Sequence, residues 1–139
     1  MAGHDDQPLQ LTQLRERVLE EFGIAWTKRD IPKLMSIVTD DCVYCASVGP
    51  EPGQSFIGRD AVQEGFRALL AHDAGGESRE GRCVVLGEIG IAEWSYVYNN
   101  SDGATIEVRG CDILQFRGVL ICRKDAFRKC FGQRSAHTG

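Results

Sequence analysis

Large apolar side chains recur three or four positions apart in the first half of the chain, a spacing that predicts helices. Residues 9–28 form the longest such stretch and predict an amphipathic helix. Asp30, followed by Pro32, predicts the capped start of a second, short helix. Gly58 and Asp60 precede another apolar stripe, so we expect a third helix there with Asp60 as its N-cap.

Strand-like runs, rich in Val, Ile, Tyr, Trp and Phe, fill the second half of the chain. One run, 41–48, follows the second helix; four more occupy 82–89, 91–99, 104–116 and 119–130. Residues 72–81 are polar and glycine-rich and are expected to form a mobile loop. Turn sequences at 99–103 and 117–118 predict two hairpins. Helices followed by a meander of strands favour an α+β fold.

Side-chain facing follows from the hairpin registers. If Tyr98 pairs with Ala104 and Phe116 with Val119, alternate residues of the last three strands share one face. That face would be aromatic and would carry two carboxylates and an arginine. Its members would include Trp94, Tyr96, Tyr98, Asp112, Arg123, Asp125 and Phe127. A one-residue slip in either hairpin would exchange the two faces.

The opposite face is too apolar at Val97, Cys111 and Ile113 to be fully solvated. A second layer is therefore expected to cover it, and a homodimer interface is the simplest source of that layer.

Charge and termini exclude several partners. The formal net charge is −4 and no Lys/Arg block occurs, so neither nucleic acid nor a membrane surface is an expected partner. The polar N-terminus lacks the pattern of a signal peptide, and no apolar run is long enough to span a membrane, which predicts a cytoplasmic protein. One domain is expected over residues 9–131, with flexible ends at 1–8 and 132–139.

Six cysteines are most simply buried thiols. Cys42 and Cys45 have the spacing of a redox or zinc motif, but they fall in a strand, where positions three apart point to opposite faces. No second Cys or His pair accompanies them. We therefore expect neither a metal nor a cofactor.

Several segments, in order and spacing, resemble the SnoaL-like proteins of the nuclear-transport-factor-2-like superfamily, relatives of polyketide cyclases, ketosteroid isomerases and limonene epoxide hydrolases. They are the helix ending in Trp26, the segments 28–34, 40–44 and 56–62, and the last two strands, 109–116 and 118–129. The resemblance covers roughly residues 9–131. It implies a cystatin-like cone, in which a strongly curved mixed or antiparallel sheet wraps three N-terminal helices around a deep pocket. It also implies a dimer.

The catalytic positions of these relatives are only partly matched. The ketosteroid isomerase base falls at Ala46 and its tyrosine at Phe22, so only the aspartate at Asp112 remains. Of the epoxide hydrolase set, Asp125 and Tyr44 are matched, whereas the other two positions fall near Trp94 and Tyr96. The aspartate of SnoaL-type cyclases is matched by Asp112.

The resemblance thus favours a cofactor-free enzyme for a hydrophobic carbonyl compound, of cyclase, isomerase, dehydratase or hydrolase type. Asp112 would be its acid or base and Asp125 would assist. The expected substrate-binding residues are Tyr44, Trp94, Tyr96, Tyr98, Trp26, Arg123 and Phe127. The alternatives are a non-catalytic binding or accessory protein and an epoxide-hydrolase-like enzyme using Asp125 and Tyr44.

Simpler structural roles compete with each assignment. Asp112 could pair with Arg123 across the strands, and Asp125 with Arg109, Lys124 or Arg128. The aromatic residues could be core, and His72 could be merely exposed.

Overall fold

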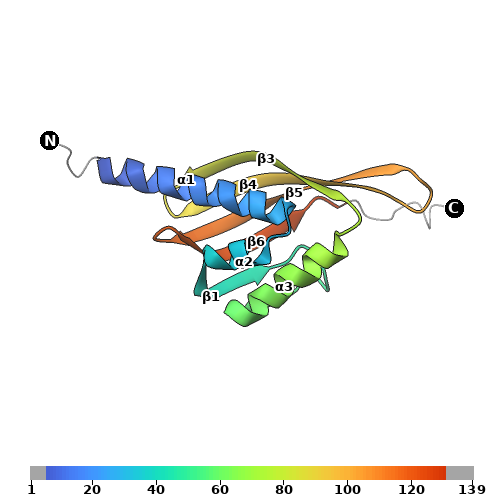
Figure 1. Ribbon diagram of the computed structural model, residues 1–139, viewed down its shortest axis with the longest axis horizontal. Helices are drawn as coiled ribbons and strands as arrows, with labels where there is room; N and C mark the ends of the chain where they lie inside the picture. The colour runs from blue at the N-terminus through green and yellow to red at the C-terminus, as the bar shows by residue number, and fades with distance from the viewer. Residues whose placement is uncertain (1–5, 131–139) are drawn as a thin grey trace.

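Three helices precede a sheet of six strands in the computed structural model, which describes residues 6–130 (Figure 1). The expected flexible tail, 132–139, and residues 1–5 of the expected flexible N-terminus lie outside the described residues. The elements are α1 (Asp6–Thr27), α2 (Ile31–Ser36), β1 (Val38–Cys45), β2 (Ser55–Ile57), α3 (Arg59–His72), β3 (Glu77–Leu86), β4 (Ile89–Asn99), β5 (Thr105–Arg117) and β6 (Leu120–Arg128).

Local sequence explains where the two shorter helices begin. The Asp30 side chain accepts a hydrogen bond from the Lys33 backbone N–H at 3.1 Å, which confirms it as the N-cap of α2. The expected cap of α3 was wrong. Gly58 holds that position with a φ of 90°, and Asp60 lies inside the first turn, where its charge favours the helix dipole.

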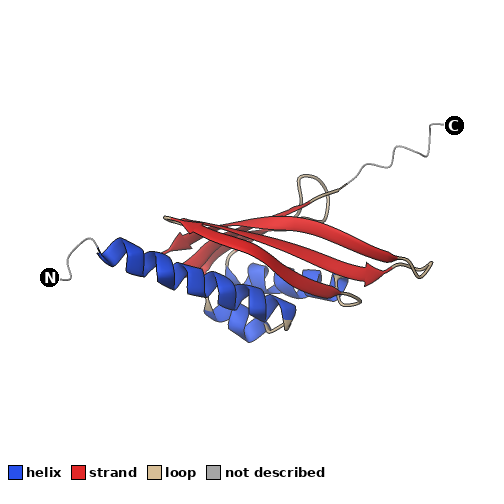
Figure 2. Cartoon of the chain, turned by 90° about the horizontal axis from the view of Figure 1, so that it is seen from above, coloured by secondary structure: helices blue, strands red, loops and turns tan. Residues whose placement is uncertain are grey.

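The strands form one sheet in the order β2-β1-β6-β5-β4-β3. Strands β1 and β6 run parallel and every other neighbouring pair is antiparallel. All three helices lie on one side of the sheet (Figure 2). The expected α+β fold with a mixed sheet is therefore confirmed.

The edge strand β3 corrects the expected loop at 72–81. It begins at Glu77, and nearly all its side chains are exposed. Sequence periodicity misses such a strand because polar residues are tolerated at a solvated sheet edge.

The β4–β5 hairpin keeps the expected facing with a different register. Tyr98 pairs with Ile106 rather than Ala104, and Trp94 with Gly110. The offset is two residues, so the same side chains still point to the same face. Asp112 and Trp94 therefore do share the inner face.

The β5–β6 hairpin contains a bulge that the sequence did not reveal. Phe116 pairs with Ile121 but Gln115 pairs with Arg123, so Cys122 is an extra residue in β6. Beyond the bulge the facing is reversed. The side chains of Lys124, Ala126 and Arg128 turn inward, and those of Arg123, Asp125 and Phe127 turn outward.

Buried apolar side chains from all three helices and the inner sheet face form the core. The buried Arg15 of α1 adds polar contacts to two turns: it donates to the carbonyl oxygens of Gly118 at 2.8 Å and Gly87 at 2.7 Å. These bonds tie α1 to two neighbouring turns at one end of the sheet. No helix within residues 6–130 is both long and apolar enough to cross a membrane.

Candidate functional site

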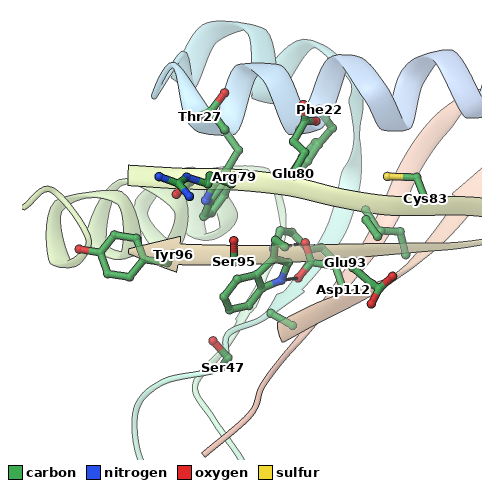
Figure 3. A pocket seen from close by; sticks show the side chains of 18 of the residues that line it. Phe22, Thr27, Ser47, Arg79, Glu80, Cys83, Glu93, Ser95, Tyr96 and Asp112 are labelled. Atoms are coloured by element: carbon green, nitrogen blue, oxygen red, sulfur yellow. Dashed lines mark hydrogen bonds and ion pairs between the residues drawn. The ribbon is translucent and has the colours of Figure 1, made fainter. Parts of the chain in front are cut away.

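A small cavity lies between α1 and the inner face of the sheet (Figure 3). Its volume is about 70 Å³, room for a few water molecules or a small ligand. Phe22 lies on its helix side, Asp112 on its sheet side and Ser47 on the loop after β1. Other residues that line the cavity include Trp26, Asp73, Glu80, Trp94, Tyr96, Lys124 and Arg128.

An ion pair is buried in the wall of this cavity. The Lys124 Nζ atom lies 3.1 Å from Asp112 Oδ2, and the two residues are only 4% and 8% exposed. They come from adjacent strands, β6 and β5. A pair so withdrawn from solvent loses most of its hydration, which its mutual attraction only partly offsets.

Aromatic rings surround the Lys124 ammonium. Nζ lies 4.6 Å from the ring centroid of Trp26, 5.0 Å from that of Tyr44 and 5.9 Å from that of Phe22. The faces of such rings attract a cation, more strongly where water is excluded. The rings and Asp112 together hold the ammonium in place.

Trp94 orients the Asp112 carboxylate from the neighbouring strand. Its indole Nε1–H donates to Asp112 Oδ1 at 3.0 Å. The indole lies over Gly110, its cross-strand partner, where a Cβ atom would collide with the ring. Gly110 thus makes room for the ring that fixes Asp112.

Tyr44 brings a hydroxyl group without a partner. Its ring is completely buried, and no hydrogen-bond partner for the OH group exists among the described residues. Burial, followed by the negative charge of Asp112, raises the pKa of Tyr44 far above its usual value. The hydroxyl therefore stays protonated and is available as a donor.

A second charged cluster lies where β6 ends. Arg128 Nη2 is 3.7 Å from Asp73 Oδ2, and Arg128 Nε donates to Ser47 Oγ at 3.4 Å. The guanidinium lies over the Trp94 ring, 5.6 Å from its centroid. Asp73 also contacts His72 Nδ1 through Oδ1 at 2.9 Å. Trp94 thus touches both charged clusters.

Glu80 lines the cavity from β3 and lies against Gly23 of α1, where a Cβ atom would collide with its carboxylate. Partial burial, followed by repulsion from Glu20, raises the pKa of Glu80.

Four of the expected site residues line the cavity: Asp112, Trp94, Tyr96 and Trp26. Tyr44 lies behind Lys124, and Tyr98 stacks on Tyr96 at 5.4 Å outside the cavity.

The expected placement of Arg123, Asp125 and Phe127 was wrong, because the bulge at Cys122 turns all three outward. Arg123 and Asp125 lie 3.5 Å apart on the outer face, and Phe127 is 48% exposed there. Asp112 consequently pairs with Lys124 and not with Arg123. Asp125 and Tyr44 also face different sides of the sheet, so the epoxide-hydrolase-like pair is not assembled.

Sequence reasoning missed Lys124, Arg128 and Asp73 as cavity residues. Without the bulge, strand alternation places Lys124 and Arg128 on the outer face of the sheet. Asp73 lies in the segment that was expected to be a loop. The one sequence signal that could have indicated these residues is a charged side chain next to apolar neighbours. The His72 side chain, by contrast, is largely exposed, which agrees with the simpler structural role expected for it.

All six cysteines are free thiols. Cys42 and Cys122 are buried, but Cys83 and Cys130 are exposed, which corrects the expectation of uniform burial. Within residues 6–130 no cluster of His, Cys, Asp and Glu is arranged to hold a metal ion.

The SnoaL-like domain family has a sequence profile that matches residues 18–124. A search of curated proteins found no match. Among solved structures, a protein of unknown function from Mesorhizobium loti, described as NTF2-like, is similar to this chain at 22% identity with a TM-score of 0.71, covering 86% of this chain and 93% of its own.

Two further similar structures have more specific descriptions. A Xanthomonas campestris pv. campestris protein provisionally called a polyketide cyclase is 18% identical with a TM-score of 0.65, covering 84% of this chain and 91% of its own. TerC, co-crystallised with polyporic acid, is 15% identical with a TM-score of 0.68, covering 84% and 92%. At these identities the likeness concerns the fold alone.

Proposed function

Because the chain belongs to the SnoaL-like domain family, we propose that its cavity binds a small hydrophobic carbonyl compound and that Asp112 moves a proton on it. The observation that carries this proposal is the buried Asp112–Lys124 pair in the cavity wall. Replacing a buried ion pair with apolar residues often leaves stability unchanged or improves it. A role of the pair in ligand binding or catalysis therefore explains its presence better than a contribution to the stability of the fold.

The two charges suit complementary roles. Asp112 would accept a proton from the carbon next to the carbonyl, while the C–H electron pair moves onto the carbonyl oxygen to form an enolate. The Lys124 ammonium would donate a hydrogen bond to that oxygen and stabilise its developing charge. Asp112 would then return the proton to the same or another carbon. The result is exchange or isomerisation without a cofactor.

Two neighbours support this arrangement. The Trp94 N–H holds one oxygen of Asp112 in position, and the Tyr44 hydroxyl is a spare donor behind Lys124. The aromatic rings around the cavity would contact the apolar part of the substrate.

Deuterium incorporation tests the proton transfer without a known substrate. Small ketones such as 2-pentanone are incubated with the protein in D₂O, and NMR follows exchange at the carbons next to the carbonyl. The wild-type protein should accelerate exchange, and Asp112→Asn should remove the acceleration. Asp125→Asn is the matched control, because it changes an aspartate on the outer face. Equal exchange by wild type and Asp112→Asn would refute the role of Asp112.

A non-catalytic binding protein is the second candidate. Its support is that both Asp112 oxygens are already engaged, by Trp94 and Lys124. In that case ketones would shift the NMR signals of the cavity residues while the exchange rate stayed at that of buffer.

We also propose that the protein is a homodimer through the outer sheet face. Ile113 is 41% and Phe127 48% exposed there, and Val97 and Cys111 are half-buried. Association would cover these apolar groups. Sedimentation should give twice the 15.3 kDa chain mass, and Ile113→Lys should shift the population toward monomer. A wild-type monomer at micromolar concentration would contradict this.

A further inference from the structure

Arg128 lies almost buried at the β6 end of the cavity, yet most of its hydrogen-bonding capacity is unused. Its side chain is 13% exposed and lines the cavity. A guanidinium has five N–H donors in a planar fork. Among the described residues it makes one hydrogen bond, the 3.4 Å contact from Nε to Ser47 Oγ. Such a group normally finds acceptors.

Asp73 does not fill the fork. Its Oδ2 atom is 3.7 Å from Arg128 Nη2, which is too long for a hydrogen bond. Its other oxygen, Oδ1, is engaged by His72, and the Arg29 guanidinium donates to the Asp73 backbone carbonyl at 3.1 Å. Asp73 therefore has other polar neighbours for Oδ1 and for its backbone carbonyl, which leaves the Arg128 fork able to bind a further acceptor.

We propose that Arg128 is a carboxylate-binding subsite, so that the natural ligand is a short oxo acid. This inference rests on the proposed function, which places the carbonyl group at the Asp112–Lys124 pair. A planar guanidinium fork matches the two oxygens of a carboxylate. Ser47 offers a hydroxyl beside it.

Trp94 sets the spacing between the two ends of the ligand. Its indole N–H bonds Asp112, and its ring face lies under Arg128. The carboxylate and the carbonyl would therefore be separated by about the width of one indole ring. The small volume of the cavity favours a short oxo acid over a bulky ring system.

Three matched probes test this subsite: 4-oxopentanoate, its methyl ester, and 2-pentanone. The acid has both groups, the ester lacks the charge, and the ketone lacks the carboxyl group. Binding is measured by titration while following the two indole N–H signals in NMR spectra. Because the chain has two tryptophans, the Trp94 signal can be assigned with one variant, Trp26→Phe.

The wild-type protein should bind the acid roughly ten- to a hundredfold more tightly than the ester or the ketone, the usual worth of a charge-assisted hydrogen bond. Arg128→Met should remove this preference, leaving all three probes equal. Arg128→Lys should keep part of it, because a lysine has the charge without the fork. Arg123→Met is the matched control, since that arginine lies on the outer face of the same strand.

The outcomes separate the two proposals. Equal binding of acid, ester and ketone by the wild-type protein, a comparison that needs no variant, would overturn the subsite alone. A preference for the acid that survives in folded Arg128→Met would also overturn it. If the wild-type protein prefers the acid but does not accelerate proton exchange on ketones, the proposed chemistry would be overturned and the subsite retained. Binding of none of the probes at millimolar concentration would contradict both.

Discussion

Lys124 reaches the Asp112 carboxylate from the neighbouring strand, so that two opposite charges meet 3.1 Å apart where almost no solvent reaches either. The pair can be tested for stability separately from activity. Lys124→Met leaves a buried carboxylate without its cation and should lower the free energy of unfolding by about 3–5 kcal/mol.

The double variant Asp112→Leu with Lys124→Met removes both charges. It should be about as stable as the wild type, because no uncompensated charge remains. Urea denaturation measures both changes. If the double variant is no more stable than Lys124→Met alone, the pair does not behave as a buried ion pair.

Tyr44→Phe should separate stability from function. The hydroxyl is buried without a partner among the described residues, so its removal should leave the protein equally or more stable. If the hydroxyl serves a ligand, the same change should weaken ketone binding or exchange. Thermal unfolding and the D₂O assay, run on the same sample, report the two effects. A clear loss of stability would show that the hydroxyl has a partner in the folded protein.

Gly110→Ala should damage the site through Trp94. The new Cβ atom would collide with the indole ring and also with the Phe127 backbone carbonyl, which cannot rotate away. We expect a loss of stability of about 1–3 kcal/mol and displacement of the Trp94 indole N–H signal. Gly75→Ala is a control, since a Cβ atom there meets open space. An unchanged indole signal in Gly110→Ala would contradict the packing.

Glu80 should make stability depend on pH. Its pKa is raised in the folded protein above the ordinary value of 4.5, so the folded state holds this proton more tightly than the unfolded state. Its contribution to stability is therefore fully present below pH 4.5 and is lost as the pH rises through the higher folded pKa. Glu80→Gln should lack this decline.

Urea denaturation measures the free energy of unfolding of the wild type and of Glu80→Gln from below pH 4.5 to neutrality. The difference between the two at each pH is the contribution of the Glu80 carboxyl group. Glu20→Gln should reduce the slope in part, because Glu20 repels the ionised carboxylate. If the free energy of unfolding of the wild type instead rose relative to that of Glu80→Gln as the pH increased, the proposed role of Glu80 would be contradicted.

Side-chain alternation along the strands explains why part of the site could be predicted from the sequence. Alternation of side chains survives a two-residue error in register, so Trp94, Tyr96 and Asp112 were placed on the correct face although every partner in the β4–β5 pairing was wrong. Asp30 was also identified, because its capping bond forms within one helical turn.

The remaining site residues depend on long-range features. Cys122 is an extra residue only in the pairing of β6 with β5, two strands whose register is set across the sheet, and no local pattern marks it. Strand β3 pairs only with β4 at the sheet edge, so its polar residues do not show a strand pattern. Lys124, Arg128 and Glu80 all lie in these two strands.

The extra residue at Cys122 has a consequence for how this protein can diverge. Deleting one residue there would turn Arg123, Asp125 and Phe127 toward the hollow and send both inward cations to the exterior. The lining would change from two positive groups to an acid, an aromatic ring and one arginine, although no side chain had been substituted. Deleting a single codon would thus exchange one ligand preference for another. A gap at this strand in an alignment of relatives would therefore mark a chain whose inward and outward side chains are exchanged beyond that point.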